Sequence, residues 1–252
     1  MKIAAAQTKP IDGNIEANLA AHVHLTTLAA DNGVKLIVFP ELSLTGYQRE
    51  SAAQLAFIEN DSRLDKLKSL AVDKNIIIVI GAPIQIKTQL HIGTFILHPD
   101  NSTSIYTKQF LHQGEEVFFA PNFEFNPTIK LEDELISLAI CADITNPLHT
   151  ANASKNKTTL YVASLFYTPN GIAEAFEELS HYAYLYSMNI LMANYTGQSY
   201  IYEAAGQSAF WNNKGHLITQ LKSNEEALLI VTKENNQWYP HQIIAQNENN
   251  NP

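Results

Sequence analysis

Apolar residues follow two patterns along this chain. Residues 36–39, Leu-Ile-Val-Phe, form an uninterrupted apolar run, which is typical of a strand buried on both faces. Residues 14–30 instead place apolar side chains near helical spacing, and Asn32-Gly33 follows as a helix end. Applied to the whole chain, these patterns predict helices at residues 14–30, 62–73 and 172–188, and strands at residues 2–7, 36–39, 76–80, 91–98, 104–108, 135–140, 159–165, 190–194, 208–211, 217–221 and 227–232.

The order of these elements indicates the class of fold. Strands and helices alternate at first, several strands follow one another later, and no interior linker or internal repeat interrupts them. This order is typical of an α/β layered architecture with a mixed sheet. We therefore predict a single domain over residues 1–245. Residues 246–252 are rich in asparagine and are predicted to form a disordered tail.

Charge and hydropathy argue against two classes of partner. Lys and Arg total 16 and Asp and Glu total 25, which gives a net charge of −9. Because phosphate binding needs concentrated cations, we predict no nucleic-acid partner. The longest apolar run, residues 76–80, is far too short to cross a bilayer, so no membrane partner is expected either. The first eight residues are predicted to form a strand and not a signal peptide.

The cysteine and histidine content bears on the compartment and on cofactors. Cys141 is the single cysteine, so no disulfide can form within the chain, and together with the missing signal peptide this predicts a reducing, cytoplasmic environment. The nine histidines are scattered, with no close pair beside a carboxylate. We therefore predict no metal site, and the sequence implies no nucleotide or flavin cofactor.

Three predicted strands end in a side chain that suits acyl transfer. Glu41, Lys108 and Cys141 each stand at the carboxyl end of an apolar strand. Ligands of open α/β sheets gather beyond such ends, so a base, a cation and a nucleophile could meet there. Taken singly, each residue has an ordinary structural role. A lone cysteine at a strand end is usually a small core residue, and Glu or Lys usually face solvent.

The sequence around the three residues makes the pattern specific. Residues 36–47, LIVFPELSLTGY, resemble the first signature of the nitrilase superfamily, the carbon–nitrogen hydrolases. Residues 106–121 are similar to its second signature, around the lysine, and residues 138–147 to its third, around the cysteine. The three signatures occur in the order seen in the family. The resemblance extends over roughly residues 1–232.

This resemblance implies a fold and a set of roles. The family has a four-layer α-β-β-α sandwich with two mixed sheets, and its members often form homodimers, so a homodimer is expected here. Carried over by position, Glu41 corresponds to the general base, Lys108 to the catalytic lysine and Cys141 to the nucleophile. The family often has a second glutamate shortly after the lysine. We assign that role to Glu116, with its neighbour Glu115 as the alternative.

These residue types suit the hydrolysis of an amide. A neutral thiol is a poor nucleophile near neutral pH, and a neighbouring carboxylate and ammonium help to remove its proton. The expected reaction cleaves a non-peptide carbon–nitrogen bond of a small amide, ω-amide or carbamoyl compound through a thioester, and it releases ammonia or an amine. Lys108 and a backbone N–H near Ala142 would hold the developing oxyanion.

Five residues are predicted to line the substrate pocket, because each follows a candidate catalytic residue or the next buried strand. They are Tyr47, Phe119, Asp143, Ile144 and Phe166.

Departures from the family signatures bear on the substrate and leave the subfamily open. Ala142 follows the nucleophile where an aromatic or acidic residue is usual, and Leu148-His149 follow Pro147. Nitrile hydrolysis is less favoured, because the Trp-Glu usual after the nucleophile of nitrilases is missing. Two further functions are compatible with this scaffold: acyl transfer to an amine in the same site, and binding without catalysis. The complete Glu–Lys–Cys set argues against a non-catalytic binding protein.

Overall fold

Two large β-sheets form the centre of the protein. The computed structural model describes residues 1–244. In this part of the chain, a seven-stranded sheet has the order β15-β14-β1-β2-β3-β4-β5, a six-stranded sheet has the order β13-β12-β9-β8-β7-β6, and β10 and β11 form a separate ribbon. The strands are β1 (Lys2–Gln7), β2 (Leu36–Val38), β3 (Ile77–Ile86), β4 (Gln89–Leu97), β5 (Thr103–Thr107), β6 (Ile129–Leu131), β7 (Glu134–Ile140), β8 (Leu160–Leu165), β9 (Asn189–Asn194), β10 (Thr196–Ser199), β11 (Tyr202–Ala205), β12 (Ala209–Trp211), β13 (Leu217–Gln220), β14 (Ala227–Glu234) and β15 (Gln237–Ile244).

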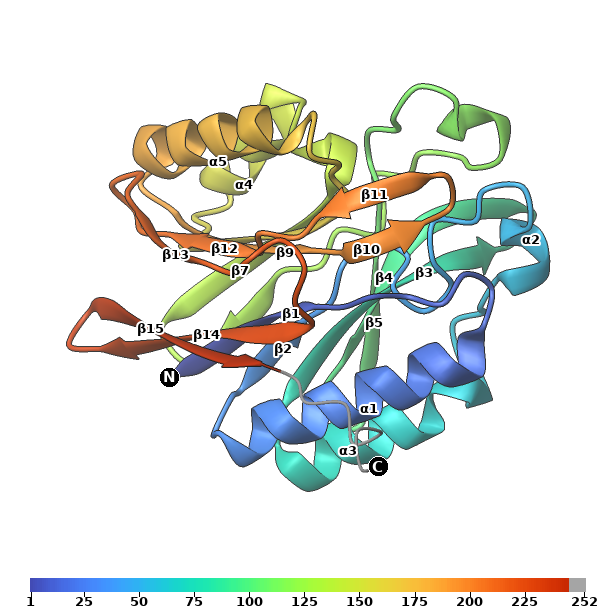
Figure 1. Ribbon diagram of the computed structural model, residues 1–252, viewed down its shortest axis with the longest axis horizontal. Coiled ribbons are helices and arrows are strands. Elements are labelled where there is room, and N and C mark those ends of the chain that lie inside the picture. Colours follow the sequence, from blue (N-terminus) through green and yellow to red (C-terminus); the bar gives the residue numbers. More distant parts are fainter. Residues whose placement is uncertain (245–252) are drawn as a thin grey trace.

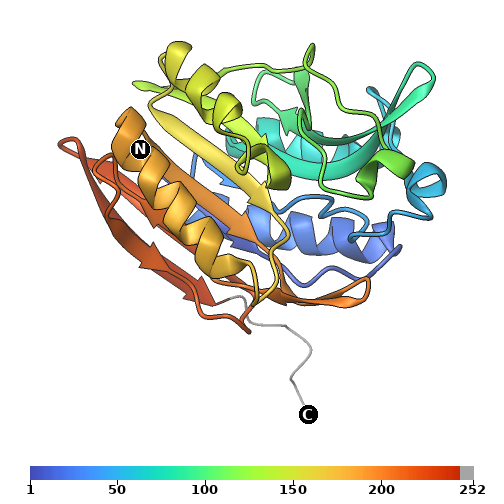
Figure 2. The same ribbon diagram turned by 90° about the horizontal axis from the view of Figure 1, so that it is seen from above.

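The longer helices cover the outer faces of the two sheets. They are α1 (Ile15–Asp31), α2 (Ala52–Leu55), α3 (Asp65–Lys74), α4 (Pro147–Lys155) and α5 (Ile172–Tyr186), with short 3₁₀ turns η1 (Ser62–Leu64), η2 (Glu115–Val117) and η3 (Cys141–Asp143). Figure 1 shows α1 and α3 below the first sheet and α4 and α5 above the second, and Figure 2 shows the same stack from above. This arrangement confirms the predicted α-β-β-α sandwich.

Alternation along the strands creates three apolar cores. In β1, Ile3 and Ala5 face the core between the two sheets, whereas Ala4 and Ala6 face the core under α1 and α3. Because successive side chains of a strand point to opposite faces, a fully apolar strand is needed wherever both faces are covered. The third core lies between the second sheet and the helices α4 and α5.

Both sheets are mixed, as predicted. Strands β1, β2 and β3 run parallel, and so do β7, β8 and β9, while the other pairings in the two sheets are antiparallel. Because these strands are parallel, the loops that follow their carboxyl ends lie at the same edge of each sheet. Candidate residues from both sheets can therefore meet at one place.

Several elements differ from the sequence prediction. The strand expected at residues 76–80 continues to Ile86, through Gly81 and Pro83. Pro83 is tolerated because pairing with β2 ends at Val79, and beyond it an isolated bridge from Phe57 continues on that side. Helix α4 and strands β6, β10, β11 and β15 were not predicted, because they are short, polar or interrupted by proline. The predicted tail, 246–252, lies outside the described residues.

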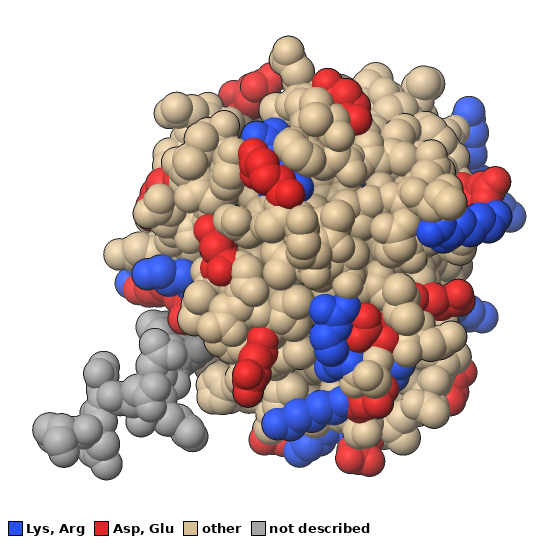
Figure 3. All heavy atoms as spheres, turned by 90° about the vertical axis from the view of Figure 1, so that its right-hand side faces the viewer, with Lys and Arg blue, Asp and Glu red and all other residues tan. Residues whose placement is uncertain are grey.

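The surface and the helices bear on the partners expected from the sequence. Figure 3 shows that acidic and basic side chains are intermingled on the face at the right of Figure 1, without a basic patch on that face. None of the helices in residues 1–244 combines the length and the apolar character that crossing a bilayer would require.

Candidate active site

Strand ends from both sheets meet at one site. Glu41 follows β2 and Lys108 follows β5, both in the seven-stranded sheet, whereas Cys141 follows β7 in the six-stranded sheet. The site therefore lies at the junction of the two sheets. Its three groups are far apart in the sequence and are brought together by the packing of one sheet on the other.

The loop that carries Glu41 is held against β3. A side chain at Gly81 of β3 would lie 2.6 Å from the Pro40 carbonyl oxygen and 2.5 Å from the Leu42 nitrogen, so this position requires glycine. Leu42 adopts a φ of +52°, which turns the chain sharply after Glu41. The hydroxyl of Tyr195 donates to the Glu41 carbonyl oxygen over 2.5 Å. The backbone is thus fixed on two sides.

Lys108 lies between two carboxylates. Its Nζ is 2.7 Å from Oε1 of Glu41 and 2.8 and 2.9 Å from the two carboxylate oxygens of Glu115. All three side chains are fully buried. Glu115 is further held by the Tyr47 hydroxyl and by the His112 backbone N–H, which both donate to its carboxylate. The cluster carries two negative charges and one positive charge when all three groups are ionised.

The glutamate that contacts Lys108 is Glu115 and not Glu116, to which the sequence assignment gave this position. Glu116 is exposed, and its carboxylate accepts a hydrogen bond from the backbone N–H of Gly114 over 2.6 Å. Both glutamates belong to the 3₁₀ turn η2, in which successive side chains diverge by about 120°. Only one of two neighbours can then face Lys108, and the sequence did not reveal which one.

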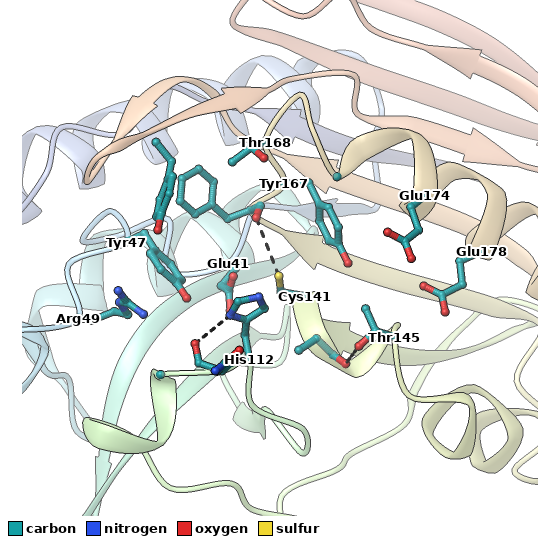
Figure 4. Close-up of a pocket in the computed structure, with 16 residues that line it drawn as sticks. Glu41, Tyr47, Arg49, His112, Cys141, Thr145, Tyr167, Thr168, Glu174 and Glu178 are labelled. Atoms are coloured by element: carbon teal, nitrogen blue, oxygen red, sulfur yellow. Dashed lines mark hydrogen bonds between the residues drawn. The ribbon is translucent and has the colours of Figure 1, made fainter.

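Cys141 stands at a sharp turn between β7 and the 3₁₀ turn η3. Its φ of +42° is rare for a residue with a side chain, and such backbone conformations cluster at functional sites. Its thiol is 3.9 Å from the carbonyl oxygen of Phe166, to which it donates. Figure 4 shows Cys141 near the middle of a pocket, with Glu41 beside it.

Burial and charge set the protonation of the site. Burial raises the pKa of Glu41 to about 7, against the opposing effect of Lys108, and the charge of Glu115 adds to the rise. Burial, together with the charge of Glu41, holds the pKa of the Cys141 thiol well above its usual range, although Lys108 opposes this. Burial favours neutral Lys108, but Glu41, Cys141 and Glu115 outweigh it and raise the pKa of that amine. The resting thiol is therefore protonated.

One carboxylate oxygen of Glu41 is available for proton transfer. Oε1 accepts from Lys108, whereas Oε2 is buried and has no hydrogen-bond partner among the described residues. Buried polar atoms are almost always paired, so this oxygen still has the capacity to accept a proton from a neighbouring group. The arrangement can deprotonate Cys141 and stabilise negative charge nearby.

A cavity of about 740 Å³ opens over these groups. Tyr47 and Phe166, two of the predicted pocket residues, line it, and their rings lie 5.1 Å apart. The residues that line the cavity are Glu41, Tyr47, Arg49, His112, Gln113, Gly114, Cys141, Ala142, Thr145, Phe166, Tyr167, Thr168, Gly171, Glu174, Glu178 and Tyr202.

Three of the predicted pocket residues are buried elsewhere. Phe119 packs in the core between the sheets, and Ile144 packs in the core under α4 and α5. The Asp143 carboxylate accepts hydrogen bonds from the backbone N–H groups of Gln109, Phe110 and Ile140 and from the Tyr106 hydroxyl. Proximity in sequence to Cys141 or Glu116 did not place these side chains in the cavity. Asp143 belongs to the turn η3, where its carboxylate faces backbone N–H groups, and the other two follow the 3₁₀ turns and pack into the cores.

Among the lining residues that sequence reasoning missed are Arg49, Tyr167, Glu174 and Glu178. Signals for them exist in the sequence. Arg49 is one of two arginines in the chain and comes two positions after Tyr47. Tyr167 directly follows Phe166, and the two glutamates are four residues apart at the start of α5, so they share one face of that helix.

Comparison with known proteins decides the family. Residues 2–240 match the family model described as Carbon-nitrogen hydrolase. The chain belongs to the carbon–nitrogen hydrolase family. The match includes all three strand ends that carry Glu41, Lys108 and Cys141.

A glutamine-dependent enzyme is among the relatives of this carbon–nitrogen hydrolase. The chain is 26% identical over 241 residues to the glutamine-dependent NAD(+) synthetase of Thermotoga maritima, a match that covers 92% of this chain and 42% of the relative. The chain thus spans less than half the length of this relative.

Solved structures show the same fold. The NitN amidase from Nesterenkonia sp. AN1 superposes with a TM-score of 0.83 at 21% identity, and the match covers 93% of each chain. The glutamine-dependent NAD+ synthetase from Acinetobacter baumannii superposes with a TM-score of 0.81 at 23% identity, and the match covers 91% of this chain and 45% of that one.

Proposed function

We propose that this carbon–nitrogen hydrolase is a cysteine-dependent amidase that cleaves a small amide, ω-amide or carbamoyl compound through a thioester acyl-enzyme. One observation carries the proposal: the ammonium of Lys108 is held between the carboxylates of Glu41 and Glu115, and Glu41 lines the same cavity as the Cys141 thiol. An amide carbon is a weak electrophile, and this arrangement supplies both an activated nucleophile and positive charge.

Formation of the thioester requires one proton transfer. Because the thiol is protonated at rest, its proton must leave as sulfur attacks the amide carbon, and Oε2 of Glu41 is the acceptor without another partner among the described residues. A base with a pKa near 7 is well matched to this role near neutral pH. The carbonyl oxygen becomes negative as the carbon–sulfur bond forms.

The positive charge of Lys108 and a backbone N–H near Ala142, a residue that lines the cavity, stabilise the oxyanion. Lys108 can donate to the oxyanion directly once it releases one of its three hydrogen bonds to Glu41 and Glu115. Each such donor typically stabilises the transition state by about 3–4 kcal/mol. Glu41 then returns its proton to the nitrogen of the leaving group, and ammonia or an amine departs as the carbon–nitrogen bond breaks. The acyl group remains on the sulfur of Cys141.

Hydrolysis of the thioester repeats the same steps with water. Glu41 takes a proton from a water molecule, the hydroxide attacks the thioester carbon, and the carboxylic acid leaves as the thiol regains its proton. Glu115 keeps Lys108 in place and balances its charge during both halves of the reaction. Tyr47, which donates to Glu115, links this carboxylate to the cavity wall.

The cavity and the relatives support an amide as the substrate class. A volume of about 740 Å³ is large enough for a small organic molecule. The names of the similar proteins, an amidase and glutamine-dependent synthetases, both describe enzymes that act on amides. We further propose a cytoplasmic location, because the free Cys141 must stay reduced to act as a nucleophile.

Ammonia release from a panel of small amides and carbamoyl compounds tests this function. We expect the wild-type protein to release ammonia from at least one member and Cys141→Ala to release none, while its circular dichroism spectrum and melting temperature stay unchanged. Near-normal ammonia release by Cys141→Ala would refute the mechanism.

Alkylation gives a second, independent measurement. Because the chain has one cysteine, incorporation of iodoacetamide reports on Cys141 alone. A substrate that is turned over should slow the labelling in proportion to the occupancy of the cavity. Labelling that proceeds at the same rate with saturating substrate would place the reaction elsewhere.

A further inference from the structure

Arg49 is a cation in the wall of the cavity that the proposed mechanism does not use. It follows Tyr47 by two residues in the loop after β2. Its guanidinium carbon lies 5.6 Å from the ring centre of Tyr47 and 5.4 Å from that of Tyr200. Gly114 lies on another side of the guanidinium, since a Cβ added to this glycine would be 3.3 Å from Nη1 of Arg49. The guanidinium therefore lies close to two aromatic rings and beside Gly114.

The guanidinium of Arg49 has no paired carboxylate among the described residues. Within residues 1–244, no carboxylate lies within 4.0 Å of it, and its Nε is buried without a hydrogen-bond partner. Its neighbour Glu50 accepts a hydrogen bond from Tyr200 over 2.7 Å. The other arginine, Arg63, is by contrast 2.6 Å from the Asp61 carboxylate. Arg49 thus presents a positive charge that no carboxylate of the described chain pairs with.

The opposite wall of the cavity carries negative charge. Glu174 and Glu178 line it from helix α5, and Figure 4 shows them on the other side of Cys141 from Arg49. A substrate with an anionic group would be repelled from the α5 wall and attracted to Arg49. The cavity can therefore orient such a molecule, with its reactive amide at Cys141 between the two walls.

We propose that Arg49 binds a carboxylate of the substrate, so that the preferred substrates are ω-amides that carry a free carboxylate, such as the monoamides of dicarboxylic acids. This inference rests on the proposed amidase function. The planar guanidinium donates two parallel hydrogen bonds to a carboxylate, and its position beside two aromatic rings lowers the entropic cost of binding. Tyr47 then contacts both Arg49 and Glu115, which connects recognition to the catalytic cluster.

Amides of matched shape and different charge test the inference. The panel pairs succinamate with 4-methylpentanamide, in which an isopropyl group replaces the carboxylate, and glutaramate with 5-methylhexanamide. 4-Aminobutanamide supplies a cationic counterpart. For the wild-type protein we expect kcat/KM to be higher for an anionic amide than for its neutral partner. A charge-assisted hydrogen bond pair is typically worth roughly 10- to 100-fold in this ratio.

Substitution of the two arginines completes the test. In Arg49→Met, which keeps an apolar stem of similar length, the ratio of kcat/KM between the anionic amide and its neutral partner should fall roughly 10- to 100-fold, mainly through KM. Arg49→Lys should retain part of the preference, since it keeps the charge without the planar fork. Arg63→Met is the matched control and should keep the wild-type ratio, because Arg63 lies outside the cavity.

The outcomes separate the inference from the function on which it depends. If no amide of either series is hydrolysed, the proposed function fails. If neutral and anionic amides are hydrolysed equally, or if Arg49→Met lowers both equally, the carboxylate site is refuted and the amidase function stands. A preference for 4-aminobutanamide would refute it as well and would assign recognition to Glu174 and Glu178.

Discussion

The structure contains two buried clusters built around carboxylates, and they differ in one respect. Around Lys108, the carboxylate of Glu41 has one oxygen without a partner among the described residues. On the neighbouring side of Cys141, the carboxylate of Asp143 accepts four hydrogen bonds, from three backbone N–H groups and from the Tyr106 hydroxyl. Both side chains are completely buried.

The difference teaches that burial alone does not identify a reacting group. Asp143 is satisfied by neutral donors that fix the loop after Lys108 and the turn at Cys141, so its role is to hold these segments together. Glu41 is only half satisfied and has a pKa raised to about 7 by burial. A buried carboxylate with an unpaired oxygen and a raised pKa is the group expected to exchange protons.

Exchanging each carboxylate for an amide should separate activity from stability. Glu41→Gln is expected to lower kcat/KM by about 10²–10⁴, the usual contribution of a general base, and to leave the melting temperature equal or higher, because a buried negative charge is removed. In Asp143→Asn, the new NH₂ group lies opposite backbone N–H donors and cannot accept their hydrogen bonds. This variant should therefore be destabilised by about 3 kcal/mol. That loss corresponds to a melting temperature lower by about 6–12 °C.

Kinetics and calorimetry on the two variants check this pair. The comparison is contradicted if Glu41→Gln melts well below the wild-type protein, or if Asp143→Asn melts at the wild-type temperature.

Two adjacent glutamates offer a finer version of the same comparison. Glu115→Gln removes a charged partner of Lys108 and should lower kcat/KM roughly 10- to 100-fold, since a hydrogen bond between charged groups is worth about 1.5–3 kcal/mol. Glu116→Gln alters an exposed side chain and should change stability by less than about 0.5 kcal/mol and activity hardly at all. Side-by-side kinetics would contradict the site geometry if Glu116→Gln were the more damaging change.

The pH profile should show a gradual loss of activity in acid. Glu41 must be ionised to accept a proton, so kcat/KM should fall about tenfold per pH unit below a midpoint near 7. The effect of pH on the stability of the fold has the opposite sign. The folded state holds this proton more tightly than the unfolded state, so the contribution of Glu41 to stability is present below pH 4.5 and is lost as the pH rises through 7.

Acid inactivation should therefore be reversible. A sample held at pH 5.5 and returned to pH 8 should recover its ammonia release, with an unchanged circular dichroism spectrum at both values. A flat profile between pH 5.5 and 8 would show that Glu41 does not limit the reaction.

The sequence predicted those parts of the fold and site that depend on local pattern. The α-β-β-α layers followed from the resemblance and agreed with the alternation of apolar runs, and the ends of three apolar strands located Glu41, Lys108 and Cys141. The register of a single 3₁₀ turn decided between Glu115 and Glu116, and no apolar periodicity records it.

The walls of the cavity were predicted only in part, for a physical reason. Tyr47 and Phe166 line it, whereas Phe119 and Ile144 turn into the cores. Arg49 and the acidic pair on α5 reach the cavity from a loop and a helix, whose facing depends on how the layers pack. Sequence spacing does not carry that information, and the homodimer and the cytoplasmic location stay predictions.

The candidate site is divided between the two sheets, since Glu41 and Lys108 come from one and Cys141 from the other. Under the proposed mechanism, neither half of the sandwich holds the complete set of groups. A shift of one sheet relative to the other by about one bond length would separate Cys141 from Glu41 and Lys108 while every strand stayed folded. The rate of turnover should therefore depend on how accurately the two layers are aligned.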